Sequence, residues 1–370
     1  GSIRFDDSAC LLTEQTKVRW RADNGGEGAP NSEWFNLDWN YRQRIRVSNN
    51  DNQTYASTSV KVNITYDAAM QSNFSDLRFT TSDGVTPVPF WLERYTASTN
   101  AQVWVLVPSL PANGQSVLHM YYGNSSTTSA SNGYAVFPAF DDFEDNNITE
   151  YSGDTTLFSA NTSPVYGGTY ALKPTNTSGK TTDGIFRFDQ TVSQGQIIRY
   201  MQYVNTTGSF DEPCTLFAVQ SPGTTNQNYA VCLELFGVDR ISLARNVENN
   251  DTSGTVLATT TVSYTTGWYE VEIDWRTNNT INVSLFNSAG SLVATTSATD
   301  SNYTSGGYGF AFWYQNGAWD SFTARPRTIT KPTVNIGAKQ TNGGASWLAA
   351  QDAPGNTLPG NIVRLRVAIE

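Results

Sequence analysis

The strongest constraint on the fold is the lack of helical periodicity. No stretch of the 370 residues keeps apolar side chains at the helical spacing of roughly 3.6 residues for three turns. Short runs of alternating character recur instead, separated by Gly, Asn, Ser and Thr, and residues 41–47 set Arg42, Arg44 and Arg46 against Ile45 and Val47. Such alternation is typical of a half-buried strand. We therefore predict an all-β chain with about two or three domains of antiparallel β-sandwich type.

The distribution of charge argues against several partners. The formal net charge of -10 is spread along the chain without an acidic tail, and the basic residues form no stripe that could follow a phosphate backbone. The sequence contains no apolar stretch of membrane-spanning length and no signal peptide, and Gly1-Ser2 resembles a cloning scar. We expect neither a nucleic acid partner nor membrane insertion by this segment. Asn-x-Ser/Thr triplets recur, as at Asn63 and Asn205, which fits a secreted or cell-surface glycoprotein.

Two of the three cysteines lie in neighbouring strand-like segments, residues 213–219 and 229–236. A hairpin of these segments would set Cys214 opposite Cys232, near enough for a cross-strand disulfide. The alternative is a pair of buried thiols, but the surface context favours the bond. Cys10 has no visible partner.

Four short motifs follow one another between residues 34 and 127. They are Trp39-Asn-Tyr-Arg42, Asp76-Leu-Arg-Phe79, Pro89-Phe-Trp-Leu-Glu93 and Tyr121-Tyr-Gly-Asn124. In this order they resemble the domain of unknown function 2341, a family of bacterial and archaeal surface domains with no known reaction. The resemblance implies an extracellular β-sandwich, which we place at residues 34–130.

A second series of motifs begins at Phe140-Asp-Asp-Phe-Glu-Asp145. It continues through the strand-like segments 165–173, 268–275, 281–286 and 307–314. In this order the segments resemble the concanavalin A-like jelly roll of lectins and glucanases. We place this domain at residues 138–335.

The two ends of the chain resemble the parts of one further unit. Lys17-Val-Arg-Trp-Arg-Ala-Asp-Asn24 stops at a Gly-rich turn, while Ala345-Ser-Trp-Leu-Ala-Ala-Gln-Asp352 and Val363-Arg-Leu-Arg366 follow the second series. Joined, they resemble a repeat of prokaryotic surface proteins. We therefore predict an outer β-domain, residues 1–33 with 340–370, split by the insertion of the other two domains at an exposed turn.

A row of carboxylates raises the question of catalysis, because Glu270, Glu272 and Asp274 alternate with apolar residues in one predicted strand. Neighbouring acids on one strand face are about 6 to 7 Å apart, close to the carboxyl separation of glycoside hydrolases. Jelly-roll glucanases, however, carry Glu-x-Asp-x-Glu, and this chain has Arg276 or Thr277 where the last glutamate should stand. We therefore predict no catalytic residues and keep a polysaccharide hydrolase as the disfavoured alternative.

The jelly-roll resemblance also implies a structural Ca²⁺ site. Jelly-roll carbohydrate-binding modules often hold the ion between an acidic first strand and an Asp in the last one, beside a Gly-rich turn. The matching ligands here are Asp142, Glu144 and Asp320, with Tyr166-Gly-Gly168 as the turn. Hard oxygen ligands from distant segments suit Ca²⁺. The alternative is that these acids cap strand ends in solvent.

Glycan binding needs aromatic faces that stack on sugar rings and planar polar groups that bind hydroxyls. The candidates are Trp313, Tyr314, Gln315, Asn316 and Trp319, with Trp268 on the face of the acid row. The alternative is that these aromatic residues belong to the core. We thus expect a non-catalytic segment of an adhesin, pilus or envelope protein at the cell surface, binding glycans or another surface component. A structural stalk or coat subunit is the rival hypothesis.

Overall fold

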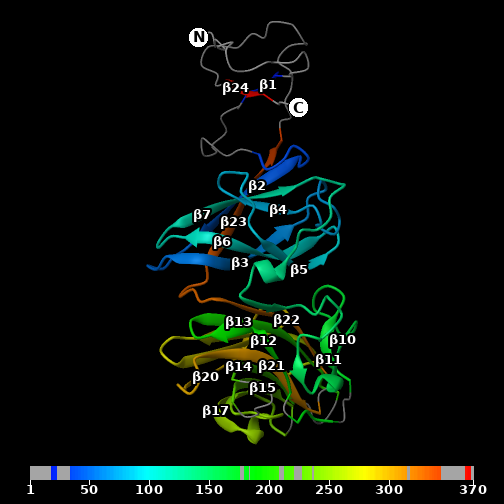
Figure 1. Ribbon diagram of the computed structural model, residues 1–370, viewed down its shortest axis with the longest axis vertical. Coiled ribbons are helices and arrows are strands. Elements are labelled where there is room, and N and C mark those ends of the chain that lie inside the picture. Colours follow the sequence, from blue (N-terminus) through cyan, green and yellow to red (C-terminus); the bar gives the residue numbers. More distant parts are fainter. Residues whose placement is uncertain are drawn as a thin grey trace.

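The computed structural model confirms the all-β class. It describes residues 18–22, 34–175, 179–182, 184–207, 212–220, 227–235, 237–314, 317–342 and 363–367. Within these ranges the regular elements are strands and three short 3₁₀-helices, η1 (Gly133–Ala135), η2 (Thr155–Leu157) and η3 (Asp251–Ser253). No helix in the described part of the chain is long and apolar enough to cross a membrane. The strands form two antiparallel sandwiches placed end to end (Figure 1).

The first sandwich packs a four-stranded sheet, in the order β23-β2-β7-β4, on a three-stranded sheet, β3-β6-β5. Its strands are β2 (Tyr41–Ser48), β3 (Tyr55–Thr65), β4 (Arg78–Thr81), β5 (Phe90–Thr96), β6 (Asn100–Leu110), β7 (Gln115–Tyr122) and β23 (Thr333–Thr341). Ile45 and Val47 point into the core between the sheets, so the predicted alternation of β2 is observed. The arginines of β2 therefore lie on the opposite face of the sheet.

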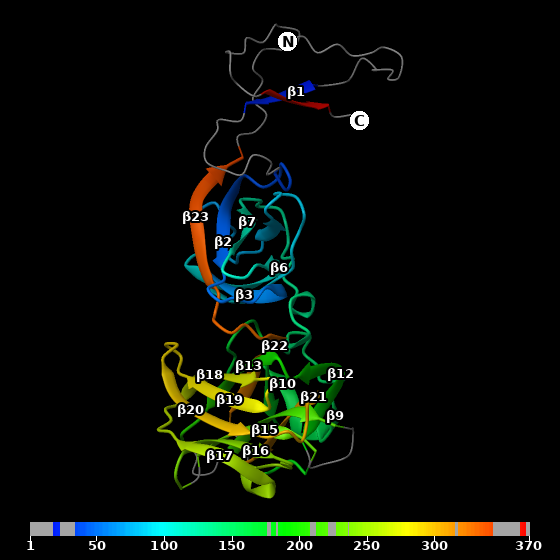
Figure 2. The ribbon, with the colours of Figure 1, turned by 90° about the vertical axis from the view of Figure 1, so that its left-hand side faces the viewer.

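Strand β23 reaches the first sandwich only after the chain has passed through the second one (Figure 2). It pairs antiparallel with β2, with Val47 opposite Val334 and Ile45 opposite Ile336. Ile45 and Val47 of β2 and Val334 and Ile336 of β23 all pack in or against the core of the first sandwich. The predicted jelly roll ended at residue 335 and the predicted outer domain resumed at 340, whereas β23 runs across both limits. Its apolar side chains, Val334 and Ile336, are partly buried against a sandwich whose first strand begins almost three hundred residues earlier.

The second sandwich contains an eight-stranded and a seven-stranded sheet. The first has the order β10-β11-β22-β13-β18-β19-β20, with β8 also paired to β22, and the second the order β17-β16-β15-β14-β21-β12-β9. The strands are β8 (Ala139–Asp141), β9 (Ser152–Gly153), β10 (Phe158–Asn161), β11 (Ala171–Pro174), β12 (Ile185–Ser193), β13 (Gln196–Val204), β14 (Glu212–Val219), β15 (Tyr229–Glu234), β16 (Arg240–Arg245), β17 (Thr255–Thr261), β18 (Gly267–Trp275), β19 (Thr280–Phe286), β20 (Leu292–Thr299), β21 (Ser305–Trp313) and β22 (Ala318–Pro326). A large aromatic core, including Tyr200, Trp275 and Tyr308, fills the space between them.

The ends of the described chain also meet. Strand β1 (Val18–Ala22) pairs antiparallel with β24 (Val363–Val367). This is the pairing that the split-domain hypothesis requires. The motif at 345–352 and Cys10 lie outside the described residues.

An aromatic cluster joins the two sandwiches. Trp91 and Trp104 of the first sandwich pack against Val136, Phe137 and Phe140, which lie on the connection into the second. The Phe140 ring lies edge-on to Trp91, with 4.9 Å between ring centroids. The connection is therefore a packed segment and not an extended tether.

Candidate functional site

The acidic row of β18 faces the first sandwich. The burial of β18 alternates residue by residue, with Val271, Ile273 and Trp275 in the core. Glu270, Glu272 and Asp274 consequently lie on the outer face of the eight-stranded sheet. The same face carries the side chains that contact β3 and β5, so the row lies at the junction of the two domains.

Each acid of the row is ion-paired. Glu270 lies 2.6 Å from Arg199, and Glu272 lies 3.0 Å from Arg325. Asp274 pairs with Arg276 at 2.8 Å and also with Arg327. A glycoside hydrolase needs one carboxyl group that stays protonated and can donate a proton. The row is instead a set of paired anions.

Electrostatics at Glu270 point the same way. Burial acts to raise the pKa of Glu270, but the charges of Arg199 and Lys61 outweigh it and hold the pKa well below its ordinary value. This carboxyl group is therefore a poor proton donor near neutral pH.

Glu93 is the centre of the junction. Its carboxylate lies 2.6 Å from Arg199 and 3.4 Å from Lys61, and it accepts a 3.0 Å hydrogen bond from Trp104 Nε1. Burial acts to raise the pKa of Glu93, but the charges of Arg199 and Lys61 lower it overall. In the same motif, Trp91 donates a 3.1 Å hydrogen bond to Asp142 of the second sandwich. The Pro-x-Trp-x-Glu motif of the first sandwich thus makes the contacts that hold the second.

Two of the predicted metal ligands converge on one turn. Asp320 on β22 is buried and accepts hydrogen bonds from the backbone N–H groups of Tyr166, at 2.8 Å, and Gly167, at 3.2 Å. Glu144 accepts hydrogen bonds from the backbone N–H groups of Thr169 and Tyr170, both at 2.7 Å. Gly168 has a positive φ, and a Cβ there would lie 2.3 Å from the Glu144 carboxyl carbon. The turn and the two acids are therefore built around one another.

The third predicted metal ligand, Asp142, lies near enough to Asp320 for its charge to act on it. Burial raises the pKa of Asp320 well above its ordinary value, its backbone hydrogen bonds act the other way, and the charge of Asp142 adds to the rise. Asp142, Glu144 and Asp320 form no ion pair with a described Lys or Arg. The donors are all oxygen atoms, which is the chemistry of a Ca²⁺ site, but these three acids are not among the described groups whose ligand atoms all lie within 4.8 Å of one another.

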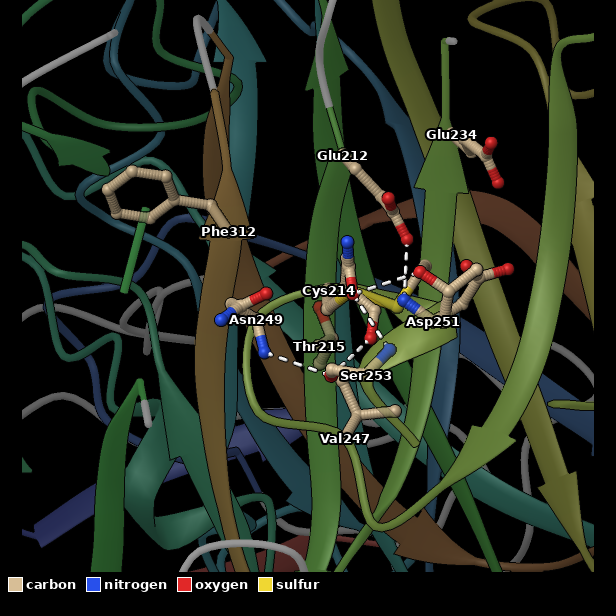
Figure 3. The surroundings of a disulfide bond; sticks show 12 residues. Glu212, Cys214, Thr215, Glu234, Val247, Asn249, Asp251, Ser253 and Phe312 are labelled. Atoms are coloured by element: carbon tan, nitrogen blue, oxygen red, sulfur yellow. Dashed lines mark hydrogen bonds between the residues drawn. A yellow bond between two sulfur atoms is a disulfide. The ribbon is translucent and has the colours of Figure 1, made fainter. Parts of the chain in front are cut away.

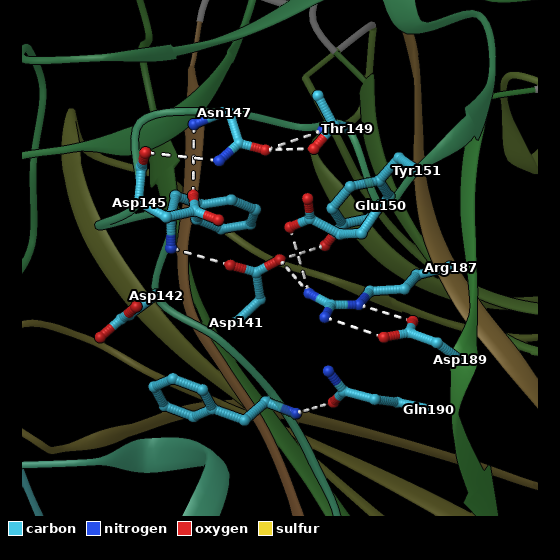
Figure 4. A network of polar contacts seen from close by, with 12 residues as sticks. Asp141, Asp142, Asp145, Asn147, Thr149, Glu150, Tyr151, Arg187, Asp189 and Gln190 are labelled. Carbon is cyan, nitrogen blue, oxygen red and sulfur yellow. Dashed lines mark hydrogen bonds and ion pairs between the residues drawn. The ribbon is translucent and has the colours of Figure 1, made fainter.

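The first acid of this segment has a different role. Asp141 lies 2.9 Å from Arg187 and accepts a 2.7 Å hydrogen bond from Tyr151, whereas Asp142 points away from this network (Figure 4). Burial raises the pKa of Asp141 to about 7 although its polar partners lower it. Arg187 also contacts Glu150 and Asp189. These contacts hold Asp141 in place, and with it the adjacent Asp142, whose side chain contacts the first sandwich.

The sugar-binding role predicted for one aromatic residue, Trp319, must be corrected. Trp319 is completely buried, its indole N–H donates to Thr215 Oγ1 at 3.1 Å, and its ring packs against Phe158 and Phe310. A ring enclosed on both faces cannot stack on a sugar. The prediction was wrong because Trp319 lies on the inner face of β22, where the core of the second sandwich needs volume.

The other candidates lie in two places. Trp313 is half-buried and Tyr314 is exposed, with 5.9 Å between their ring centroids, while Gln315 and Asn316 lie outside the described residues. Trp268 is half-buried near the junction, and its ring lies 5.7 Å from that of Tyr166. Among the described residues, Trp268 makes ring contacts with Tyr166 and Tyr203 and none with Trp313 or Tyr314.

A groove of about 550 Å³, which we call the junction groove, lies where β3, β5 and β6 meet the Tyr166 turn. Its main polar and aromatic lining consists of Asn63, Arg94, Tyr95, Asn100, Gln102 and Tyr166. The Arg94 guanidinium lies 4.4 Å from the Tyr166 ring centroid and donates to Gln102 at 3.2 Å. Tyr95 is 47% exposed. Sequence reasoning missed this groove because its walls come from segments far apart in the chain.

A second acidic cluster lies over the disulfide of the seven-stranded sheet. Cys214 and Cys232 face each other on β14 and β15 and are bonded (Figure 3). Glu212, Glu234 and Asp251 gather beside them, and burial, together with the charge of Asp251, raises the pKa of Glu212 to about 8. Arg240 pairs with the other two acids, at 2.5 and 3.0 Å. Arg240 is the one cation paired with this cluster among the described residues, and Glu212 itself has no ion pair with it.

Comparison with known proteins identifies part of the chain. The model of the domain of unknown function (DUF2341) matches residues 73–156, from the loop before β4 into the first elements of the second sandwich. The predicted resemblance at 34–127 is thereby confirmed in its family and displaced in its range. No curated protein matches. A solved carbohydrate-binding module, CBM66 from Bacillus subtilis, is similar over 48% of this chain and 97% of that one, at 13% identity and a TM-score of 0.34.

Proposed function

We propose that this chain is a non-catalytic binding segment of an extracellular or cell-surface protein and that it recognises glycans in the junction groove. The observation that carries the proposal is the chemistry of the groove lining. The Tyr166 ring, with the Arg94 guanidinium over it, and the amides of Asn63, Asn100 and Gln102 line the groove, while Tyr95, which contacts Phe74 on the other face of β5, lies at its edge. Rings that stack on sugars and planar amides that bind hydroxyls are what a glycan site requires.

The junction itself supports this proposal. Tyr166 enters the groove from the second sandwich, while the other lining residues come from the first. Trp268 backs Tyr166 from β18, so the one jelly-roll aromatic predicted on the acid-row face would support the site and not touch the sugar. A glycan in this groove would contact both domains. The ion pairs of Glu93 and Arg199 hold the two walls in register.

A glycan array with the purified chain tests the proposal. We expect selective binding that is lost in Tyr95→Ala and retained in Tyr314→Ala, the matched control on the other exposed aromatic patch. Loss in Tyr314→Ala alone would move the site to the tip of β21. A blank array for the unaltered chain would leave the structural stalk, which the end-to-end stacking of the sandwiches also suits.

We further propose that Ca²⁺ is held by Asp142, Glu144 and Asp320. The ion would pin the turn that carries Tyr166, and thereby one wall of the groove. Binding of an ion to the native state alone raises the melting temperature. We expect a higher Tm in Ca²⁺ than in chelator, and no such difference in Asp320→Asn. Asp145→Asn is the control, because Asp145 is exposed and hydrogen-bonds only to Asn147 among the described residues. An equal Tm in Ca²⁺ and chelator would contradict the ion site.

The disulfide supports the proposed location. A bonded Cys214–Cys232 pair is maintained outside the reducing cytoplasm. The proposed role in adhesion, within a pilus or envelope protein, rests on this setting. Measurement of free thiols in protein isolated from its native source is the direct check, and a reduced pair would oppose an extracellular location.

A further inference from the structure

A second groove, which we call the Arg44 groove, opens on the other sheet of the first sandwich. It has a volume of about 570 Å³ and is lined by β2, β7, the ends of β4 and β6, and β23. Arg44 and His119 lie directly opposite each other in the β2–β7 ladder, on the face that points away from the core. The junction groove is lined by the other end of β6 with β3 and β5, and the two grooves share no lining residue.

Arg44 shares with Arg46, on the same strand, the lack of a carboxylate partner among the described residues, and of the two only Arg44 lines the groove. In the part of the chain that the structure describes, no hydrogen bond or ion pair engages its guanidinium. By contrast, the charged network of the second sandwich pairs each of its arginines with a carboxylate; these are Arg187, Arg199, Arg240, Arg245, Arg276, Arg325 and Arg327. A chain with ten more acids than bases, at a net charge of -10, has many carboxylates to offer. Arg44 is left available to an anion from outside.

The residues around Arg44 also favour an anion. The residues that line the groove include no Asp or Glu. The carboxylate that acts on His119 is that of Asp83, which is already held by Thr81, Val85 and Thr86. An anion in the groove would therefore meet a positive potential without a built-in competitor.

The rest of the lining offers hydrogen bonds to hydroxyl groups. Thr81, Ser82, Ser109, Ser116 and Gln340 also line this space. The hydroxyls of Thr81 and Ser116 already donate to Asp83 and to the Ser109 carbonyl, and Gln340 Oε1 accepts from Arg42, which leaves the hydroxyls of Ser82 and Ser109 and the amide N–H groups of Gln340. His119 adds a ring with one donor and one acceptor, because burial and the charges of Arg42 and Arg44 lower its pKa to about 4 and keep it neutral.

We propose that the Arg44 groove binds a carboxylate- or sulfate-bearing unit of an acidic glycan. The guanidinium of Arg44 would take the anionic group with two parallel hydrogen bonds, and the hydroxyl and amide groups would take the sugar hydroxyls. Nucleic acid fits the groove less well, because its only ring is the buried His119 and base stacking needs an open aromatic surface.

The test is a binding titration of the whole chain with four polymers: dextran, carboxymethyl-dextran, dextran sulfate and single-stranded poly(dT). We expect binding to at least one of the acidic dextrans, with dextran at least about tenfold weaker, since a charged hydrogen-bonded contact contributes on the order of a tenfold change in Kd. The two acidic arms distinguish carboxylate from sulfate as the recognised group. Equal binding of dextran, or preferred binding of poly(dT), would overturn the proposal.

Two matched variants distinguish binding in the Arg44 groove from a general electrostatic attraction of the acidic polymers to the protein surface. Arg44→Gln and Arg46→Gln each remove one positive charge from the same strand face, but Arg46 does not line the groove. We expect Arg44→Gln to weaken binding about tenfold or more and Arg46→Gln to weaken it less than about threefold. Equal losses would show a diffuse charge effect and contradict the site.

Discussion

Replacement of Arg199 by Met should loosen the junction between the two sandwiches. The Arg199 side chain is 1% exposed and lies 2.6 Å from both Glu93 and Glu270. Met keeps most of the side-chain length and removes the charge. Two carboxylates would then face each other with only Lys61 as a shared cation, at 3.4 and 3.5 Å.

The expected cost follows from burial. Loss of one partner of a buried ion pair costs about 3–5 kcal/mol because the other charge is left without compensation. Glu93 is fully buried, but Glu270 is 23% exposed and Lys61 remains, so we expect about 3 kcal/mol, near the lower end. The matched control is Arg327→Met. Asp274 keeps Arg276 there and all the partners are partly exposed, so we expect less than about 1 kcal/mol.

Hydrogen exchange at the amides of β5 and β13 is a suitable assay, because a chain with several domains need not unfold in one step. A loss of about 3 kcal/mol corresponds to exchange faster by about two orders of magnitude at these strands. Glu93→Gln in the Arg199→Met background should restore part of the protection, since it removes the uncompensated charge. Unchanged protection in Arg199→Met, or the same loss in Arg327→Met, would refute the idea that this ion pair couples the domains.

Three further predictions concern stability. The folded-state pKa of Glu93 is lowered, so its contribution is fully present above its ordinary pKa of 4.5 and is lost as the pH falls through the lower folded value; an acid titration in which β5 already loses its protection well above pH 4.5 would contradict this. Replacing Cys214 and Cys232 together by Ser should cost about 3 kcal/mol, measured by urea unfolding of the second sandwich, since the bond closes a short loop of 18 residues. Trp319→Ala should cost about 3–5 kcal/mol in the same assay because it empties the core, and half-buried Trp313→Ala distinctly less; equal costs would place Trp319 outside the core.

Local pattern was enough to predict a large part of this protein. The two-residue period of residues 267–275 places Glu270, Glu272 and Asp274 on one strand face and Val271, Ile273 and Trp275 on the other, as observed. Hairpin geometry likewise brings Cys214 opposite Cys232, because the spacing between neighbouring strands sets the partner once the turn is located. These features depend on residues close together in the chain.

What lies against each face was decided by tertiary structure alone. The period that separates the faces of β18 contains no information on whether the acids meet water, a substrate or the first sandwich. The same limit applies to Trp319, because the sequence of β22 does not indicate which of its faces is enclosed. It also applies to β23, whose apolar side chains pack against the core of the sandwich to which β2 belongs. The walls of the junction groove come from β3, β5, β6 and the Tyr166 turn, so the groove exists only after both sandwiches have packed. A strand's own residues determine its two faces, whereas the free energy of burial, summed over distant segments, selects what covers them.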